Sequence, residues 1–273
     1  DDATGSVRPQ DYAAHLTPEV RVATILHTSP VTGIANDVAG IAAAIRAVAP
    51  DAFIIVDGIQ HASHGHIDIA SYYIDGYVVS PYKVFSRHGY GVAWVSDRLT
   101  ALIPEQLKDG PAQNWEMGTR DAGAYATFSD VVAYMQWLGT QVSDADAPRA
   151  QIEAAGAAIG AHEAALTDAM LNGIDNLAGL AELPGVTILA GRQNAAREGL
   201  VCFALDTLPA SEIVAALNER GIRTHIRKDD HYSGNILTPL SLRGAVRVST
   251  CHYNTLDEVK ALLAAMAEIS SAS

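Results

Sequence analysis

The stretch VVSPYKVF, residues 78–85, places Lys83 just after a short apolar run. Residues 76–79 lie between polar residues and predict a buried strand that ends shortly before the lysine. A second apolar run, residues 53–56, ends in Asp57 and predicts another strand. The sequence therefore predicts an acid and a lysine at the ends of two nearby strands.

The first half of the chain alternates short strands with helices. Strands are expected at residues 22–26, 52–56, 76–79 and 91–95. One helix is expected to follow the Asn36-Asp37 cap. Two more are expected at residues 67–73 and at residues 120–138. Short strands separated by helices are typical of a layered α/β sheet whose strands are largely parallel. We therefore predict an α/β fold, with an incomplete large domain of mostly parallel sheet at residues 1–143.

The second half predicts a smaller α+β C-terminal domain, residues 144–273. It begins near a linker at residues 143–148 and includes a long alanine-rich helical segment that the Pro184-Gly185 pair interrupts. Further strands are expected at residues 186–190, 200–205, 222–226 and 245–250, and further helices at residues 210–220 and 256–269.

The composition is that of an ordinary globular protein, because 49% of the residues are apolar and 18% are charged. The net charge of −13 argues against nucleic acid or an anionic membrane as the main partner, since both attract basic surfaces. No apolar segment is long enough to span a membrane, and the first residues carry no secretory signal. Cys202 and Cys251 lie in apolar runs, which indicates core thiols in the reducing cytoplasm.

Asp57 and Lys83 together fit a binding site for pyridoxal 5'-phosphate. A carboxylate facing the pyridine nitrogen keeps that nitrogen protonated, and a lysine amine forms a Schiff base with the cofactor aldehyde. Gln60 is placed to donate to the phenolic oxygen, and Ser80 and Tyr82 carry hydroxyls suited to phosphate oxygens. The structural alternatives are an aspartate that caps the turn after its strand and a lysine whose amine reaches into water.

Several segments of this chain, taken in order, resemble the class V aminotransferase and cysteine desulfurase family. Its members have the fold of aspartate aminotransferase and use pyridoxal phosphate. The resemblance rests on residues 56–60, Asp68, residues 75–77 and 80–83, Gly118-Thr119, and residues 247–249, 252–255 and 258–259. It implies that Thr119 reaches the phosphate of a partner subunit's cofactor, so a homodimer is expected. It also implies that Arg247 binds the α-carboxylate of an amino acid substrate, a task that suits a bidentate guanidinium.

The resemblance implies a pyridoxal phosphate-dependent enzyme, in the first place an aminotransferase. In the expected mechanism an amino acid displaces Lys83 from the cofactor, Lys83 moves the α-proton, and Asp57 keeps the ring nitrogen protonated. A cysteine desulfurase-like carbon–sulfur lyase and an amino-acid epimerase are alternatives. Another alternative is an inactive truncated fragment or scaffold, because relatives begin upstream of Asp1, and that upstream part supplies a phosphate-binding helix N-terminus and the ring stacked on the cofactor.

The chain also departs from the family pattern. Desulfurases of this family carry a nucleophilic cysteine on a loop before the carboxylate-binding arginine, and residues 224–235 contain no cysteine. A persulfide mechanism is therefore not expected, and His231 in that loop is instead a candidate contact for the substrate. A solvated charged loop explains the same residues. Pro30 stands where many relatives have an asparagine close to the cofactor ring.

Histidines are frequent around the predicted site. His61, His64 and His66 follow Gln60 closely, but their spacing matches no zinc pattern, so no metal site is predicted. His27 lies at the end of the first predicted strand. It belongs either near the site or to a structural hydrogen bond.

Overall fold

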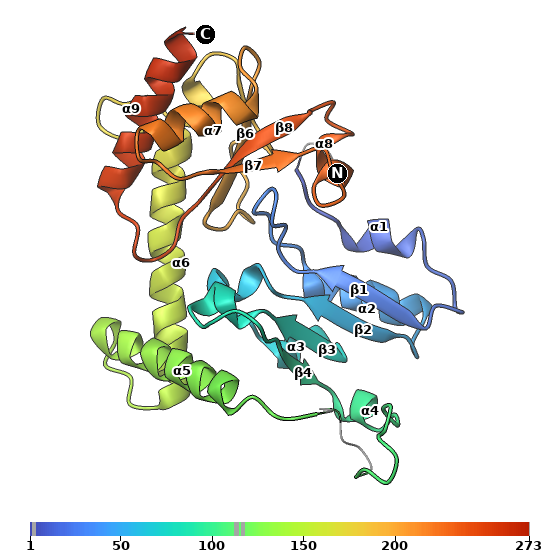
Figure 1. The fold of residues 1–273 in the computed structure, drawn as a ribbon. Helices are drawn as coiled ribbons and strands as arrows, with labels where there is room; N and C mark the ends of the chain where they lie inside the picture. The colour runs from blue at the N-terminus through green and yellow to red at the C-terminus, as the bar shows by residue number, and fades with distance from the viewer. Residues whose placement is uncertain (2–3, 112–114, 116–117, 273) are drawn as a thin grey trace. The chain divides into compact units, whose positions relative to one another are not determined.

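The computed structural model describes the backbone of residues 1, 4–111, 115 and 118–272 (Figure 1). Contacts within the chain divide it into two compact units. We call one the α/β unit, which comprises Val7–Thr28 and Asn36–Gly156, and the other the C-terminal unit, which comprises Asp1–Ser6, Ser29–Ala35 and Ala157–Ser273. None of the described helices is both long enough and apolar enough to cross a membrane.

The sheet of the α/β unit has the strand order β1-β2-β3-β4 (Figure 1). β1 pairs with β2 and β2 with β3 in parallel, whereas β4 is antiparallel to β3. This mostly parallel sheet confirms the predicted α/β fold class. The strands are β1 (Val22–Leu26), β2 (Phe53–Asp57), β3 (Gly76–Val79) and β4 (Val92–Val95).

Helix α2 (Val38–Val48) follows β1 and covers one face of this sheet. It begins at the predicted cap, where the Asp37 carboxylate accepts a hydrogen bond from the Gly40 N–H. Alternate strand residues such as Ile54 and Val56 pack against Ile41 of α2. Because side chains alternate along a strand, Asp57 lies on the opposite face of the sheet from Val56. The remaining helices of the unit are α1 (Pro9–Ala13), α3 (Ile69–Tyr72), α4 (Asp97–Thr100) and α5 (Ala122–Val142), with 3-10 turns η1 (His61–Ser63) and η2 (Pro81–Val84).

The C-terminal unit contains an antiparallel sheet with the order β5-β6-β8-β7. Its main core lies on one face of this sheet, where strand residues pack against helices. Fully buried members of this core include Phe203, Val246, Leu166, Ile213 and Leu263. The elements are α6 (Pro148–Asn172), which begins in the α/β unit, η3 (Leu180–Glu182), β5 (Val186–Ile188), β6 (Leu200–Leu205), α7 (Ala210–Glu219), β7 (His225–Lys228), α8 (Gly234–Leu237), β8 (Gly244–Ser249) and α9 (Leu256–Ala272).

Two predicted boundaries in this half are wrong. The alanine-rich helix ends at Asn172 and does not continue toward Pro184, because Gly173 turns the chain with a φ of +90°. The strand expected at residues 222–226 is shifted to β7 (His225–Lys228). The N–H of Ile222 caps α7 by donating to the Leu217 carbonyl, so this residue ends a helix and does not start a strand.

The short segment Ser29–Ala35 follows β1 but belongs to the C-terminal unit. Ile34 forms an isolated antiparallel bridge with Arg197, and the Glu198 N–H donates to the Gly33 carbonyl. Gly33 has a φ of +75°, and a Cβ there would lie 2.8 Å from the Leu200 carbonyl oxygen, so glycine is required for this close approach. The segment is thereby held against β6.

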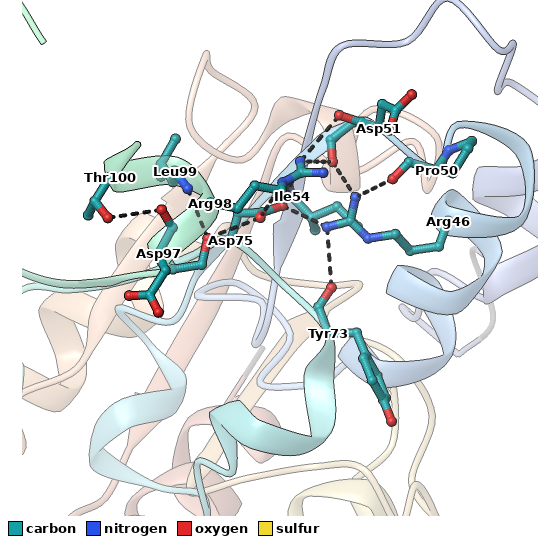
Figure 2. A network of polar contacts seen from close by, with 12 residues as sticks. Arg46, Pro50, Asp51, Ile54, Tyr73, Asp75, Asp97, Arg98, Leu99 and Thr100 are labelled. Atoms are coloured by element: carbon teal, nitrogen blue, oxygen red, sulfur yellow. Dashed lines mark hydrogen bonds and ion pairs between the residues drawn. The ribbon is translucent and has the colours of Figure 1, made fainter. Parts of the chain in front are cut away.

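Asp75, just before β3, is the centre of a buried ion-pair network in the α/β unit (Figure 2). Its carboxylate accepts from Arg46 Nη2 at 2.6 Å, Arg98 Nε at 3.0 Å and Ser96 Oγ at 3.1 Å, and from the Ile54 N–H at 3.0 Å. Burial opposes ionisation of Asp75, but the hydrogen bonds from Ile54 and Arg46 and the two arginine charges outweigh it and hold its pKa below the usual value. The network ties the starts of β2 and β3 to α2 and α4.

An Asp75→Asn variant is expected to lose about 3 kcal/mol of unfolding free energy at pH 7, because it leaves two arginines beside a neutral amide. Asp146→Asn, an exposed change of the same type, is the control. Because the pKa of Asp75 is depressed on folding, its stabilisation is full above the unfolded value of about 4 and is lost as pH falls through the folded value. Urea unfolding from pH 7 down to pH 3 measures this, and equal midpoints for both variants would contradict the role of the network.

Candidate active site

Lys83 lies in η2, directly after β3, and its Nζ donates a hydrogen bond of 2.9 Å to Gln60 Oε1. Gln60 is buried in the turn after β2. β2 and β3 are parallel, so their carboxyl ends lie at the same edge of the sheet. The structure therefore brings Lys83 together with the residue three positions beyond Asp57.

Asp57 is the last residue of β2 and is paired with Val78 in β3. Its Oδ1 accepts a hydrogen bond of 3.0 Å from the Ile59 N–H. This is the turn-capping role that the sequence also allowed. Within the described residues its second oxygen, Oδ2, accepts no hydrogen bond, so the carboxylate can cap the turn and still accept from another group.

Ser80 and Tyr82 flank Lys83 on the chain but have different surroundings. Ser80 is half-buried at the start of η2, and its carbonyl accepts from the Lys83 N–H. The Tyr82 ring is exposed and stacks on the His88 ring with centroids 4.3 Å apart. Their expected contact with a phosphate group stays a prediction.

The histidines near the site are hydrogen-bonded to protein groups. The rings of His27 and His61 stack with centroids 3.4 Å apart, and His27 Nδ1 is 2.8 Å from the Tyr77 hydroxyl. Burial, followed by the neighbouring His61 ring, lowers the pKa of His27 to about 3, so the His27 ring is neutral at pH 7. Among the described residues no group of His, Cys, Asp or Glu is suited to a metal ion.

Sequence reasoning missed a short hydrogen-bonded chain that includes Lys83. Gln60 Oε1 accepts from Lys83, so its amide nitrogen Nε2 faces His64 Nε2 at 3.0 Å. An amide nitrogen only donates, which makes His64 Nε2 the acceptor of this hydrogen bond. The cluster of His61, His64 and His66 after Gln60 was the available signal, but it was weighed as a metal site and rejected, and no partner for the glutamine was predicted from it.

The predicted substrate-binding residues lie in the C-terminal unit. Arg247 is in β8, and its Nη1 donates 2.9 Å to the Pro30 carbonyl oxygen. His231 is exposed in the loop after β7, with its ring 4.0 Å from that of Tyr232. Thr119, the predicted contact to a partner's cofactor, belongs to the α/β unit and is exposed. The roles of these residues stay predictions.

The two cysteines lie outside the loop after β7. Cys202 is fully buried in β6, and burial raises the pKa of its thiol to about 12. Cys251 follows β8 and is half-buried, and burial raises the pKa of its thiol as well. A nucleophilic cysteine needs an accessible thiolate, which neither environment favours.

Residues 1–262 match the family of class V aminotransferases. The chain belongs to this family. A probable cysteine desulfurase of Treponema pallidum is 25% identical over 97% of this chain and 63% of that protein. The apo cysteine desulfurase of Thermococcus onnurineus NA1 is 21% identical, with a TM-score of 0.80 over 100% of this chain and 65% of that one. A mutant of the lyase C-DES, with glycine covalently linked to its pyridoxal phosphate, is 21% identical, with a TM-score of 0.70 over 95% of this chain and 63% of that one.

The family match confirms the predicted family, and the solved structures confirm the predicted fold class. The chain spans less than two thirds of the length of these relatives. Two of the relatives named above are cysteine desulfurases, and the aminotransferase that the sequence analysis put first is not among those named.

Proposed function

We propose that this protein is a pyridoxal phosphate-dependent carbon–sulfur lyase that acts on an amino acid without a cysteine nucleophile of its own. The observation that carries the proposal is the absence of cysteine from residues 224–235 together with the burial of Cys202. A related solved structure is that of the cystine C–S lyase C-DES with its reaction product, cysteine persulfide. Cleavage by elimination needs no thiolate from the protein, which fits the two cysteines described above.

The residues at the carboxyl edge of β2 and β3 fit the cofactor. When bound, pyridoxal phosphate supplies an electron sink for negative charge at the substrate α-carbon. Lys83 supplies the amine for the covalent link, and Asp57 Oδ2 supplies the acceptor for the protonated ring nitrogen. Gln60 is adjacent to Lys83 and offers an amide to the phenolic oxygen. Hydroxyls for the phosphate come from Ser80 and Tyr82, and Thr119 serves the phosphate of a partner's cofactor.

The protein residues then have distinct tasks. Lys83 Nζ, as a free amine, would accept the α-proton of the substrate, and its hydrogen bond to Gln60 would keep the amine in place for that transfer. Arg247 holds the α-carboxylate, and His231 is a candidate contact for the substrate side chain. The Cβ–S bond breaks with its electron pair on sulfur, and the sulfur then takes up a proton from water.

The test supplies pyridoxal phosphate with L-cysteine and measures sulfide, pyruvate and alanine. Elimination predicts sulfide and pyruvate in equal amounts and no alanine. A Cys251→Ala variant is expected to keep its rate within about twofold, because no sulfur passes through a protein thiol. Alanine as the product, or a large loss of rate in Cys251→Ala, would show sulfur transfer to a cysteine. Amino transfer to an added keto acid would show an aminotransferase, and a protein that stays colourless would be inactive.

We also infer that the protein forms a homodimer in the cytoplasm. Helix α5 has 21 residues, of which two, Ala124 and Gly139, are buried. Large apolar side chains exposed on this helix are Tyr125, Val132, Trp137 and Val142. Such exposure marks an interaction surface, and a second copy would cover it. Light scattering on the purified protein distinguishes a dimer from a monomer.

The inference of a cytoplasmic location is supported by the free thiols of Cys202 and Cys251, which suit a reducing compartment.

A further inference from the structure

Arg227 and Arg247 converge on one oxygen atom in the C-terminal unit. His225 pairs with Arg247 between β7 and β8, and Arg227 lies two residues further along β7, so both arginines point from the same face of the sheet. Arg227 Nη2 and Arg247 Nη1 each donate 2.9 Å to the Pro30 carbonyl oxygen. Two cationic side chains therefore share a single neutral acceptor.

Neither arginine has a negative partner among the described residues. No ion pair includes Arg227 or Arg247, and the Nε of each is buried without an acceptor in this part of the structure. Cys202 lies near Arg227 but is neutral, because burial raises its thiol pKa to about 12. Asp230 is close enough to affect the pKa of Arg227, yet its Oδ1 accepts from two backbone N–H groups of its own loop.

Arg197, in the same unit, has more acceptors for its Nη atoms, although its Nε is also buried without an acceptor among the described residues. Its two Nη atoms donate to the carbonyl oxygens of Thr32, Leu200, Leu189 and Gly191. Four backbone acceptors surround that guanidinium, whereas Arg227 and Arg247 have one between them. Two adjacent, half-buried positive charges repel each other unless an anion lies between or beside them.

We infer that Arg227 and Arg247 form a single anion-binding site for a substrate with two negative groups. One α-carboxylate on Arg247 would leave the charge of Arg227 uncompensated. The substrate is therefore an amino acid with sulfur on its Cβ and a second anionic group beyond the Cβ–S bond, such as a carboxylate on the sulfur substituent or a sulfinate, and Arg227 selects that group. Arg227 is thus a specificity-determining residue. The inference rests on the proposed function, since it names the substrate class of the same site.

The test measures binding of succinate and butyrate to the full chain by calorimetry, without pyridoxal phosphate. These acids have the same number of carbon atoms and differ by one carboxylate. We expect succinate to bind at least about tenfold more tightly than butyrate, the effect of one charged hydrogen-bonded contact. Arg227→Gln should abolish this preference while binding butyrate as before, and Lys228→Gln, which removes the neighbouring exposed charge of β7, should keep it.

Equal or undetectable binding of the two acids by the unchanged protein would overturn the inference. An Arg227→Gln variant that loses both acids equally would do so too, because that would indicate a clamp on one carboxylate. Arg227→Lys keeps the charge, so it should retain part of the preference, and circular dichroism shows whether each variant folds. The binding measurement uses protein without pyridoxal phosphate, whereas the lyase activity is measured from sulfide and pyruvate. A failure of the anion-binding inference can therefore be distinguished from a failure of the proposed lyase function.

Discussion

A Lys83→Ala variant is expected to lose the covalent link to pyridoxal phosphate and, with it, at least about a thousandfold of the turnover. The variant removes both the amine that holds the cofactor and the base that accepts the α-proton. Borohydride reduction followed by mass spectrometry should locate the cofactor on the peptide that contains residue 83, and this label should be missing from Lys83→Ala.

Two further variants separate chemistry from folding. Lys83→Arg keeps a positive donor toward Gln60 but cannot form the link, so it should be as inactive as Lys83→Ala while unfolding at a urea concentration close to that of the unchanged protein. Lys108→Ala removes an exposed lysine and should leave both the label and the rate unchanged. An unchanged cofactor spectrum in Lys83→Ala would refute the assignment of Lys83.

Asp57→Asn is expected to lower turnover by about a hundredfold or more, because a neutral amide cannot stabilise a protonated ring nitrogen. The asparagine oxygen can still accept from the Ile59 N–H, so the turn after β2 is kept and the unfolding free energy should change little. The measurement compares turnover and urea midpoint in the same preparations. Asp51→Asn, an exposed change just before the other end of β2, is the control.

The opposite pattern would assign Asp57 to the turn alone. In that case Asp57→Asn would retain its turnover, and Asp57→Ala would lose stability without a further effect on chemistry. The spectrum of bound pyridoxal phosphate provides a second check. If it responds to pH in the same way in Asp57→Asn and in the unchanged protein, residue 57 does not control the ring nitrogen.

The elements that carry the candidate cofactor-binding residues could be predicted from local patterns. Runs of apolar residues bounded by polar ones identified β2 and β3, and the positions of Asp57 and Lys83 at their ends followed from those boundaries. Asp37 identified the start of α2 because an N-cap is a local property of a few residues. Predicted boundaries were wrong by several residues where a turn or cap ended a helix inside a run that otherwise fitted a regular element. This happened at Gly173, which turns the chain, and at Ile222, whose N–H caps α7.

The contacts that define the site are of another kind. The hydrogen bond between Lys83 and Gln60 joins two turns that become neighbours through the parallel pairing of β2 and β3. The sequence suggested a role for Gln60 toward the cofactor but did not indicate that this residue touches the lysine. The His27–His61 stack has the same origin, because the two rings come from the ends of different strands.

The sequence by itself indicated the family, through the resemblance of several ordered segments, and it predicted the α/β class and the positions of Asp57 and Lys83 at strand ends from residue type and short-range spacing. Tertiary structure alone decided that Arg227 and Arg247 meet at the carbonyl of Pro30. The two arginines lie 197 and 217 positions after Pro30 along the chain. Such a meeting depends on the pairing of β7 with β8 and on the attachment of Ser29–Ala35 to β6. Neither leaves a periodic signal in the sequence, because each results from packing between segments that are distant along the chain.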